Sequence, residues 1–280
     1  MAAVKERIDI LLMNLNVCES RNRAAAYILE GRVSVGGVTV KKPGEKFDVN
    51  VKIDFKDPEE EYVSRGAYKL MRAVDRYDIS FQGRTCLDIG ASTGGFTQLM
   101  LRRGAERVVC VDVGTGVLHP KIKNDPRVTA FEQTHINKFS LSEAGLDFVD
   151  VITCDVSFIS VLKFIDKFPA FTRDGAAALI LIKPQFEADV SEVKKGGVVM
   201  DRAIHRRIIM NFINEFAKKN FIFEGIVNTP KLKDCKNIEY LIFLKKHDKI
   251  TDNALTDLSS IENEVIELIE GAFHEFGRKS

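Results

Sequence analysis

Apolar residues along this chain recur with two different spacings, and the change between them outlines its organisation. Over residues 8–15 they have the spacing of an amphipathic helix, and a second helix is predicted over residues 21–30. Residues 33–40 then alternate between apolar and polar around Gly36-Gly37, which predicts a β-hairpin. Two helices and a hairpin make a small α+β module.

A polar, proline-containing break over residues 57–64 separates this module, residues 1–56, from the rest of the chain. Beyond the break, strand and helix patterns alternate, which predicts an α/β domain with a doubly wound parallel sheet over residues 65–247. The expected strands are 85–89, 108–113, 128–131, 149–154, 177–182, 221–228 and 240–244, and the expected helices are 67–77, 95–103, 158–168 and 203–220. An amphipathic pattern over residues 258–276 predicts one more helix within a C-terminal tail of residues 248–280.

The composition of the 280 residues, 45% hydrophobic and 29% charged, is typical of a globular protein. The longest apolar run, Ala176–Ile182, is too short to cross a bilayer, and the first residues lack the apolar core of a signal peptide. We therefore expect a cytoplasmic protein that does not enter membranes. None of the five cysteines forms a C-x-x-C pair and no histidine has a partner at metal-ligand spacing, so we expect reduced thiols and no metal site.

A glycine-rich loop follows the first strand of the expected sheet and is the candidate cofactor site. The loop spans residues 90–96, with Ser92 where a dinucleotide fingerprint has its second glycine, and Asp88 precedes it. An acidic neighbour is a poor companion for a diphosphate but suits a cationic ligand such as S-adenosylmethionine. Asp112 ends the next strand, where a carboxylate can hydrogen-bond both ribose hydroxyls. We expect S-adenosylmethionine here, with NAD or a purely structural turn as the alternatives.

Four charged side chains stand at or near the ends of predicted elements: Lys69, Asp155, Lys183 and Glu239. Because a charge beside an apolar run is costly to bury, it tends to mark a strand end, where the sites of α/β domains lie. Two ammonium groups with two carboxylates are suited to removing a proton from a hydroxyl. The alternative is that the four residues are solvated strand ends or an ordinary ion-pair network.

Three motifs together resemble the TlyA family of ribosomal RNA 2′-O-methyltransferases, whose members are often catalogued as haemolysin A. The motifs are Ser64 to Leu70, Asp88 to Phe96 and Lys183 to Glu187. The larger domain is similar to FtsJ/RrmJ methyltransferases, and residues 1–56, with Val33 to Val38 and Lys42-Pro43-Gly44, resemble an S4 RNA-binding domain. The resemblance covers residues 5–245, so the tail helix lies beyond it.

The resemblance implies S-adenosylmethionine-dependent methylation of a ribose 2′-oxygen in ribosomal RNA, with cytidine as the expected nucleotide. It implies a catalytic tetrad of Lys69, Asp155, Lys183 and Glu239, and cofactor contacts at Gly90, Ser92, Gly94, Gly95, Phe96 and Asp112. Lys183 is the candidate base, because partial burial and the neighbouring cation Lys69 favour its neutral amine. Asp155 would hold Lys183, and Glu239 would hold Lys69. Relatives often have Asn-x-Arg where this chain reads Thr134 to Asn137, so contacts there are not predicted.

RNA contacts are expected from local basic residues, because the net charge of the whole chain is only +1. Residues 1–56 hold ten Lys/Arg against seven Asp/Glu, a net charge of +3. The candidate contacts are Arg21, Arg23, Arg32, Lys41, Lys42 and Arg65. A solvated basic face is the alternative for the first five. As alternative functions, the catalogue name suggests a membrane-active haemolysin, and loss of catalysis would leave an RNA-binding protein. Neither the oligomeric state nor the ribosomal subunit modified is predicted.

Overall fold

The computed structural model of the chain describes residues 5–15, 17–18, 20–55, 62–231, 236–248 and 258–277. The chain divides into two units, Met1–Glu61 and Tyr62–Ser280, each of which is described by itself. Residues 57–61 of the expected linker lie outside the described residues, as does Cys235.

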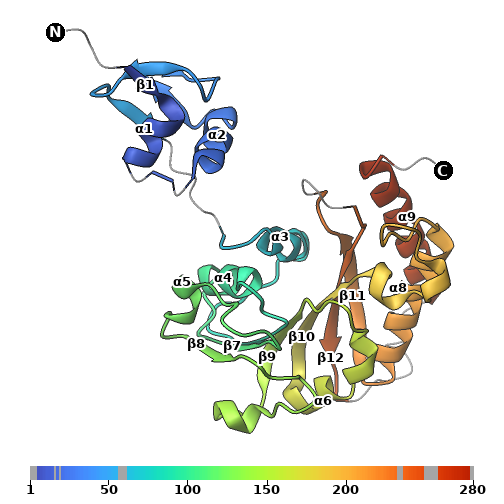
Figure 1. The fold of residues 1–280 in the computed structure, drawn as a ribbon. Helices are drawn as coiled ribbons and strands as arrows, with labels where there is room; N and C mark the ends of the chain where they lie inside the picture. Colours follow the sequence, from blue (N-terminus) through green and yellow to red (C-terminus); the bar gives the residue numbers. More distant parts are fainter. Residues whose placement is uncertain are drawn as a thin grey trace. The chain divides into compact units, whose positions relative to one another are not determined.

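In its described residues, the first unit contains two helices and five short strands (Figure 1). The helices are α1 (Ile8–Asn14) and α2 (Arg21–Leu29), and the strands are β1 (Lys5–Arg7), β2 (Val33–Val35), β3 (Val38–Thr39), β4 (Lys46–Asp48) and β5 (Ile53–Phe55). The Ser20 hydroxyl accepts a hydrogen bond from the backbone N–H of Arg23 at 3.3 Å, which fixes the start of α2. The predicted hairpin is confirmed, because β2 and β3 are antiparallel around Gly36 and Gly37, both with positive φ.

Seven strands form one sheet in the described part of the second unit, in the order β11-β12-β10-β9-β6-β7-β8. Their bounds are β6 Thr85–Ile89, β7 Arg107–Val111, β8 Val128–Phe131, β9 Val149–Cys154, β10 Thr172–Ile182, β11 Phe221–Asn228 and β12 Tyr240–Lys246. The helices are α3 Gly66–Arg76, α4 Gly95–Arg102, α5 Pro120–Lys123, α6 Lys167–Phe171, α7 Pro184–Glu187, α8 Arg202–Ala217 and α9 Leu258–Glu275. The expected doubly wound α/β architecture is therefore present.

Strand β12 departs from the expected parallel sheet, because it runs antiparallel to both of its neighbours, β10 and β11. The strands from β10 to β8 are all parallel. A parallel connection requires a crossover of a dozen or more residues, usually a helix, whereas only residues 229–239 join β11 to β12. The chain therefore turns back on itself and reverses the direction of its last strand.

The single helix predicted over residues 158–168 is also wrong. In its place lie a 3₁₀ helix, Val161–Phe164, and the short helix α6, Lys167–Phe171. Pro169 explains the break, because it has no N–H to donate to the preceding turn and its ring would clash with a carbonyl there. Proline is tolerated in the first turn of α6, where the backbone N–H has no partner within the helix.

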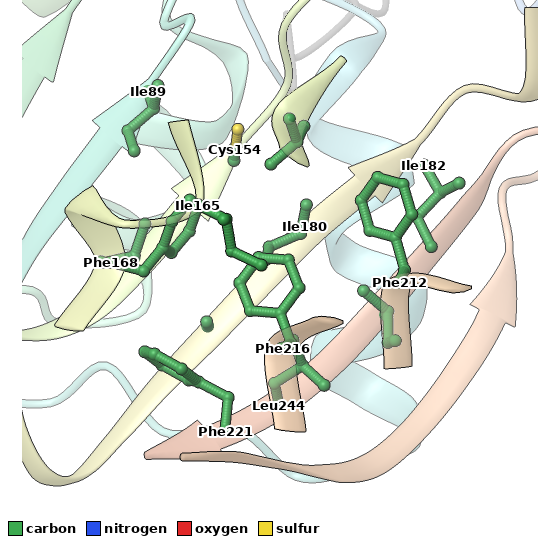
Figure 2. Close-up of a cluster of buried hydrophobic side chains, with 14 of the residues drawn as sticks. Ile89, Cys154, Ile165, Phe168, Ile180, Ile182, Phe212, Phe216, Phe221 and Leu244 are labelled. Atoms are coloured by element: carbon green, nitrogen blue, oxygen red, sulfur yellow. The ribbon is translucent and has the colours of Figure 1, made fainter. Parts of the chain in front are cut away.

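Alternating strand residues fill two apolar layers, one on each face of the sheet. Helices α3, α4 and α5 cover one face, and α6, α8 and α9 cover the other (Figure 1). On the second face, aromatic rings of α6, α8 and β11 gather over the middle of the sheet (Figure 2). The ring of Phe168 lies edge-on to those of Phe216 and Phe221, with centroids 5.1 and 6.3 Å away. The tail helix α9 thus belongs to this core, through side chains such as Val265 and Phe273.

Candidate active site

The carboxyl ends of four neighbouring parallel strands bring the predicted site residues to one edge of the sheet. The register pairs Ile89 of β6 with Val111 of β7 and with Cys154 of β9. The residues that follow these strands and β10 are Gly90, Asp112, Asp155 and Lys183. Because parallel strands end at the same edge, residues far apart in the sequence become neighbours here.

Lys183 and Asp155 form a largely buried ion pair. The Nζ atom of Lys183 lies 2.5 Å from Oδ1 of Asp155, and it donates a hydrogen bond to Oγ of Ser157 at 2.7 Å. The Lys183 side chain is only 8% exposed and that of Asp155 is 20% exposed. Since Pro184 begins α7 directly after Lys183, the lysine backbone is fixed between a central strand and a helix.

Lys69 and Glu239 form a second pair across the end of the sheet. Lys69, in α3, donates to Oε2 of Glu239 at 2.7 Å, and the two side chains are 16% and 14% exposed. The other carboxylate oxygen of Glu239 accepts a hydrogen bond from Nε2 of Gln185 at 3.1 Å. Gln185 belongs to the helix that follows Lys183, so it connects the two pairs through the backbone of α7.

The glycine-rich loop turns sharply between β6 and α4. Gly90, Ser92 and Gly94 all have positive φ, at 77°, 48° and 93°. A Cβ on Gly90 would lie 2.5 Å from the backbone oxygen of Asp155, so only glycine fits between this loop and the end of β9. Ser92 adopts a left-handed conformation that is uncommon for a side-chain-bearing residue, which is typical of loops shaped by function.

Asp112 holds this loop from the neighbouring strand. Its Oδ2 accepts the backbone N–H of Ser92 at 2.8 Å, and its Oδ1 accepts that of Gly114 at 2.7 Å. A carboxylate oxygen has a further lone pair, so both oxygens remain able to accept a hydrogen bond from a ligand.

Two adjoining cavities open at this edge and share Gly90, Ser92, Asp155 and Ser157 in their walls. The first, of about 290 Å³, is lined by Asp112 and by apolar side chains that include Val113, Ile136, Phe158 and Phe164. The second, of about 350 Å³, is lined by Arg65, Lys69, Gly95, Phe96, Lys183 and the loop residues between them. The first cavity is thus suited to an apolar ring with a hydroxylated sugar, and the second is lined by Lys69 and Lys183.

Asp88 is not part of either cavity wall, in contrast to the position that its sequence context suggests. It is fully buried, and its carboxylate accepts hydrogen bonds from the hydroxyls of Thr97 at 2.6 Å and Thr153 at 2.8 Å. Burial raises the pKa of this carboxyl to about 6. Gly94 likewise faces away from the cavities, since a Cβ there would meet Leu118 at 2.9 Å. Both residues shape the loop from behind.

Three side chains at the site were not singled out from the sequence: Ser157, Phe158 and Gln185. Phe158 is the most unusual, with 89% of its surface exposed and a φ of 65°. It lies on the rim of the first cavity, and its ring centroid is 4.9 Å from that of Phe186. The sequence pattern predicted a helix at this residue. Only its position just after Asp155 and Ser157 could have indicated that it belongs to the site.

The candidate RNA-contacting side chains of the first unit differ in whether they already have partners within the protein. Arg21 pairs with the buried carboxylate of Asp9, and Arg32 pairs with Glu30. Arg23 donates to the hydroxyl of Tyr27 at 3.0 Å. Lys41 and Lys42 are exposed, and neither has an ion pair within the described residues. The arginines therefore also serve the internal structure of the module.

The described residues offer neither a metal site nor a membrane-spanning helix. No group of three or more His, Cys, Asp and Glu side chains there could hold a metal ion. In the same residues, no helix has both the length and the apolar character needed to span a membrane.

Comparisons with known proteins identify both units. The profile of FtsJ-like methyltransferases matches residues 62–246, and that of the S4 domain matches residues 6–53. The 16S/23S rRNA (cytidine-2′-O)-methyltransferase TlyA of Mycobacterium tuberculosis is 35% identical over 255 residues, which cover 91% of this chain and 94% of the relative. Hemolysin A of Brachyspira hyodysenteriae is 36% identical, over 84% of this chain and 98% of the relative. A solved structure of a candidate hemolysin from Streptococcus thermophilus matches with a TM-score of 0.71 and 32% identity, and the match covers 99% of this chain and 98% of that one.

The buried Asp88 should make the stability of the protein fall as the pH rises. Its folded-state pKa of about 6 lies above the ordinary aspartate pKa of 3.8, so between these values the folded state keeps a proton that the unfolded state has lost. The stabilisation is complete below pH ~4 and is lost as the pH rises through ~6, by on the order of 3 kcal/mol. The measurement is the urea unfolding free energy of wild type minus that of Asp88→Asn at pH 4 and pH 7.

The control for this experiment is Asp147→Asn, whose carboxylate is exposed in the folded protein. A wild-type curve that runs parallel to the Asp88→Asn curve over the whole pH range would show that Asp88 does not carry a raised pKa.

Proposed function

We propose, from the premise that this chain belongs to the FtsJ-like methyltransferase family, that it methylates a ribose 2′-oxygen of ribosomal RNA with S-adenosylmethionine as the donor. The expected nucleotide is cytidine, because the relatives named TlyA are cytidine-2′-O-methyltransferases of ribosomal RNA. Such a substrate implies a cytoplasmic protein. The observation that carries the proposal is the arrangement of the Lys183–Asp155 and Lys69–Glu239 ion pairs. Lys183, Asp155 and Lys69 all line the second cavity together with the glycine loop.

The first cavity has the hydrogen-bond acceptors and the apolar walls that an adenosine requires. Asp112 offers two acceptor oxygens for ribose hydroxyls, and Val113, Ile136 and Phe164 offer apolar walls for a purine. The tight turn at Gly90 lets the backbone approach a ligand closely. When bound, S-adenosylmethionine supplies a methyl group on a positively charged sulfur. Asp155 lines both cavities, so a carboxylate rather than a further cation borders the space between them.

Removal of the hydroxyl proton falls to Lys183 in this proposal. In its neutral form Nζ accepts the proton of the ribose 2′-hydroxyl as that oxygen becomes the nucleophile. Asp155, 2.5 Å away, orients the amine and stabilises the ammonium that results. The hydroxyl of Ser157 at 2.7 Å fixes a second direction around Nζ, which leaves the remaining direction for the substrate.

Lys69 acts as a positioned cation beside this proton acceptor. Glu239 and, through it, Gln185 hold the Lys69 ammonium in place. Lys69 lines the same cavity as Lys183, so it can stabilise negative charge that develops on the ribose oxygen. Positioning of this kind contributes without any change in covalent bonding.

The N-terminal S4 module would provide part of the RNA affinity. Its exposed Lys41 and Lys42 suit phosphate contacts, and Arg65 on the wall of the second cavity suits a phosphate near the target ribose. Arg21, Arg23 and Arg32 remain candidates at the surface of the same module. Phosphate contacts fix the register of an RNA, and the cavity then selects the nucleotide.

Lys183→Ala should lower methyl transfer by about 10²- to 10⁴-fold while S-adenosylmethionine and RNA binding stay near wild type. Lys183→Arg should fail as well, because a guanidinium keeps its charge and cannot accept the proton. The assay is tritiated methyl incorporation into ribosomal RNA or ribosomal subunits, with ligand binding and thermal unfolding measured in parallel. Lys245→Ala, at an exposed position near the far end of β12, is the control.

Full activity of Lys183→Arg would leave Lys183 an electrostatic role only. Full activity of Lys183→Ala would overturn the assignment of the tetrad.

Asp112→Ala should weaken S-adenosylmethionine binding by about 10- to 100-fold, because it removes charge-assisted hydrogen bonds to the ligand and to the loop. Asp112→Asn, which keeps one acceptor oxygen, should give an intermediate affinity. Calorimetric titration with S-adenosylmethionine, S-adenosylhomocysteine and NAD measures this. Equal affinity of wild type and Asp112→Ala would remove Asp112 from the site, and binding of NAD alone would reject the proposed cofactor.

Phe158→Ala should lower kcat/KM for RNA by about 10- to 100-fold, because an exposed ring at the rim of the site is placed to stack on the base of the target nucleotide. Phe158→Tyr keeps the ring and should keep most of the activity. Steady-state kinetics on an RNA fragment that contains the target measure both variants. Wild-type kinetics for Phe158→Ala would exclude base stacking at this position.

A further inference from the structure

The segment between α7 and α8 carries two adjacent lysines at its tip, and residues 189–200 are called the lysine loop below. The backbone N–H of Lys194 donates to the carbonyl of Val198 at 2.9 Å, which closes a short hairpin. Gly196 and Gly197 turn the hairpin with φ of 97° and 75°, and no atom lies within 4 Å of a Cβ built on either. The tip therefore projects from the surface.

Several contacts hold the lysine loop in one conformation. Asp189 and Glu192 form a capping box around a 3₁₀ turn, and Arg207 of α8 pairs with Glu192 at 2.5 Å. Nδ2 of Asn237 donates to the carbonyl of Gly197 at 2.9 Å. A ring nitrogen of the buried His205 lies 3.2 Å from the carbonyl of Val199. These contacts hold the base and sides of the loop, and the bond from Asn237 reaches the turn itself at Gly197.

The lysine loop contains two acids and two lysines, and both acids, Asp189 and Glu192, pair with Arg207 of α8. Lys194 and Lys195 are exposed, and neither has an ion-pair partner in the part of the chain that the structure describes. The basic residues of the adjoining helix α8 are paired, as Arg202–Glu270, Arg206–Glu262 and Arg207–Glu192. Val190, in the same loop, is 93% exposed. Two exposed lysines without ion-pair partners among the described residues, in a loop whose acids are paired elsewhere, are suited to a partner with negative charge.

The position of the lysine loop relates it to the candidate active site. The loop begins two residues after α7, the helix that starts beside Lys183. Its bond to Asn237 fixes it to the segment that carries Glu239. The chain and this hydrogen bond thus join the loop to the two segments that carry Lys183 and Glu239, one member of each catalytic pair.

We propose that the lysine loop binds the RNA backbone next to the target nucleotide, with Lys194 and Lys195 each neutralising one phosphate. The inference rests on the proposed function and specifies how its RNA substrate is held. A flexible ammonium acts as a point charge that tolerates variable phosphate geometry, and phosphate contacts set the register without reading sequence. Because the net charge of the chain is only +1, local contacts of this kind must supply the electrostatic part of RNA affinity.

The test is the double variant Lys194→Gln/Lys195→Gln in the full chain. Binding to a ribosomal RNA fragment is measured from 50 to 200 mM KCl, together with methylation kinetics and S-adenosylmethionine affinity. We expect RNA affinity to fall by about 10-fold or more at low salt, and the slope of log K against log salt to become shallower by about 1.4 to 1.8, as for the loss of two phosphate contacts. KM for RNA should rise, and kcat at saturating RNA and S-adenosylmethionine affinity should stay as in wild type.

The matched control is Lys218→Gln/Lys219→Gln, which removes two adjacent lysines at the other end of α8, where they pair with Glu215 and Asp166. Equal losses in the loop variant and the control would mean a general charge effect and would overturn the proposal. Wild-type RNA binding by the loop variant, with wild-type protein active, would overturn the proposal but leave the methyltransferase function standing. A defect on ribosomal subunits but not on isolated RNA would assign the loop to a ribosomal protein instead. A wild-type protein that neither binds nor methylates RNA would reject both proposals.

Discussion

The burial of the Lys183 ammonium is the constraint on which the site depends. Lys183 directly follows β10, whose last seven residues are all buried, so its charge lies where water cannot solvate it well. Such a charge is stable only with a close partner, and removal of one partner from a buried pair is strongly destabilising. Asp155 provides that partner because β9 and β10 are adjacent and parallel. The sheet topology and the proposed proton acceptor therefore depend on each other.

The strands of the sheet were largely predictable, because short apolar runs with polar ends leave few alternatives. The predicted bounds of β6, β8, β9 and β11 agree with the structure. The direction of β12 was not predictable from its own residues, since an alternating or apolar pattern is the same read in either direction. Only the short connection over residues 229–239 shows that the chain turns back.

The residues at the site were predictable by type and position, but the directions of their side chains were not. Asp88 illustrates the difference. Its place before the glycine loop suggested a ligand contact, but along β6 it shares the face of Cys86 below α4. The hydroxyls that donate hydrogen bonds to its carboxylate belong to Thr97 and Thr153. Thr153 is 65 residues away from Asp88 in sequence. The exposed ring of Phe158 was not predicted for a similar reason. The helical pattern of its segment does not reveal that the backbone of this residue has a positive φ, which turns the ring outward.

The close packing at Gly90 restricts which substitutions this site can accept during evolution. A Cβ on Gly90 would clash with the backbone oxygen of Asp155, so any side chain at position 90 would displace the strand end that carries the proposed catalytic carboxylate. The obstacle is a peptide group rather than a flexible side chain, so no second substitution nearby can make room for it. The loop proposed to bind the donor and the strand proposed to handle the proton are consequently constrained to change together. Variation in substrate choice is left to the surfaces around them, such as the rim at Phe158 and the outer loops.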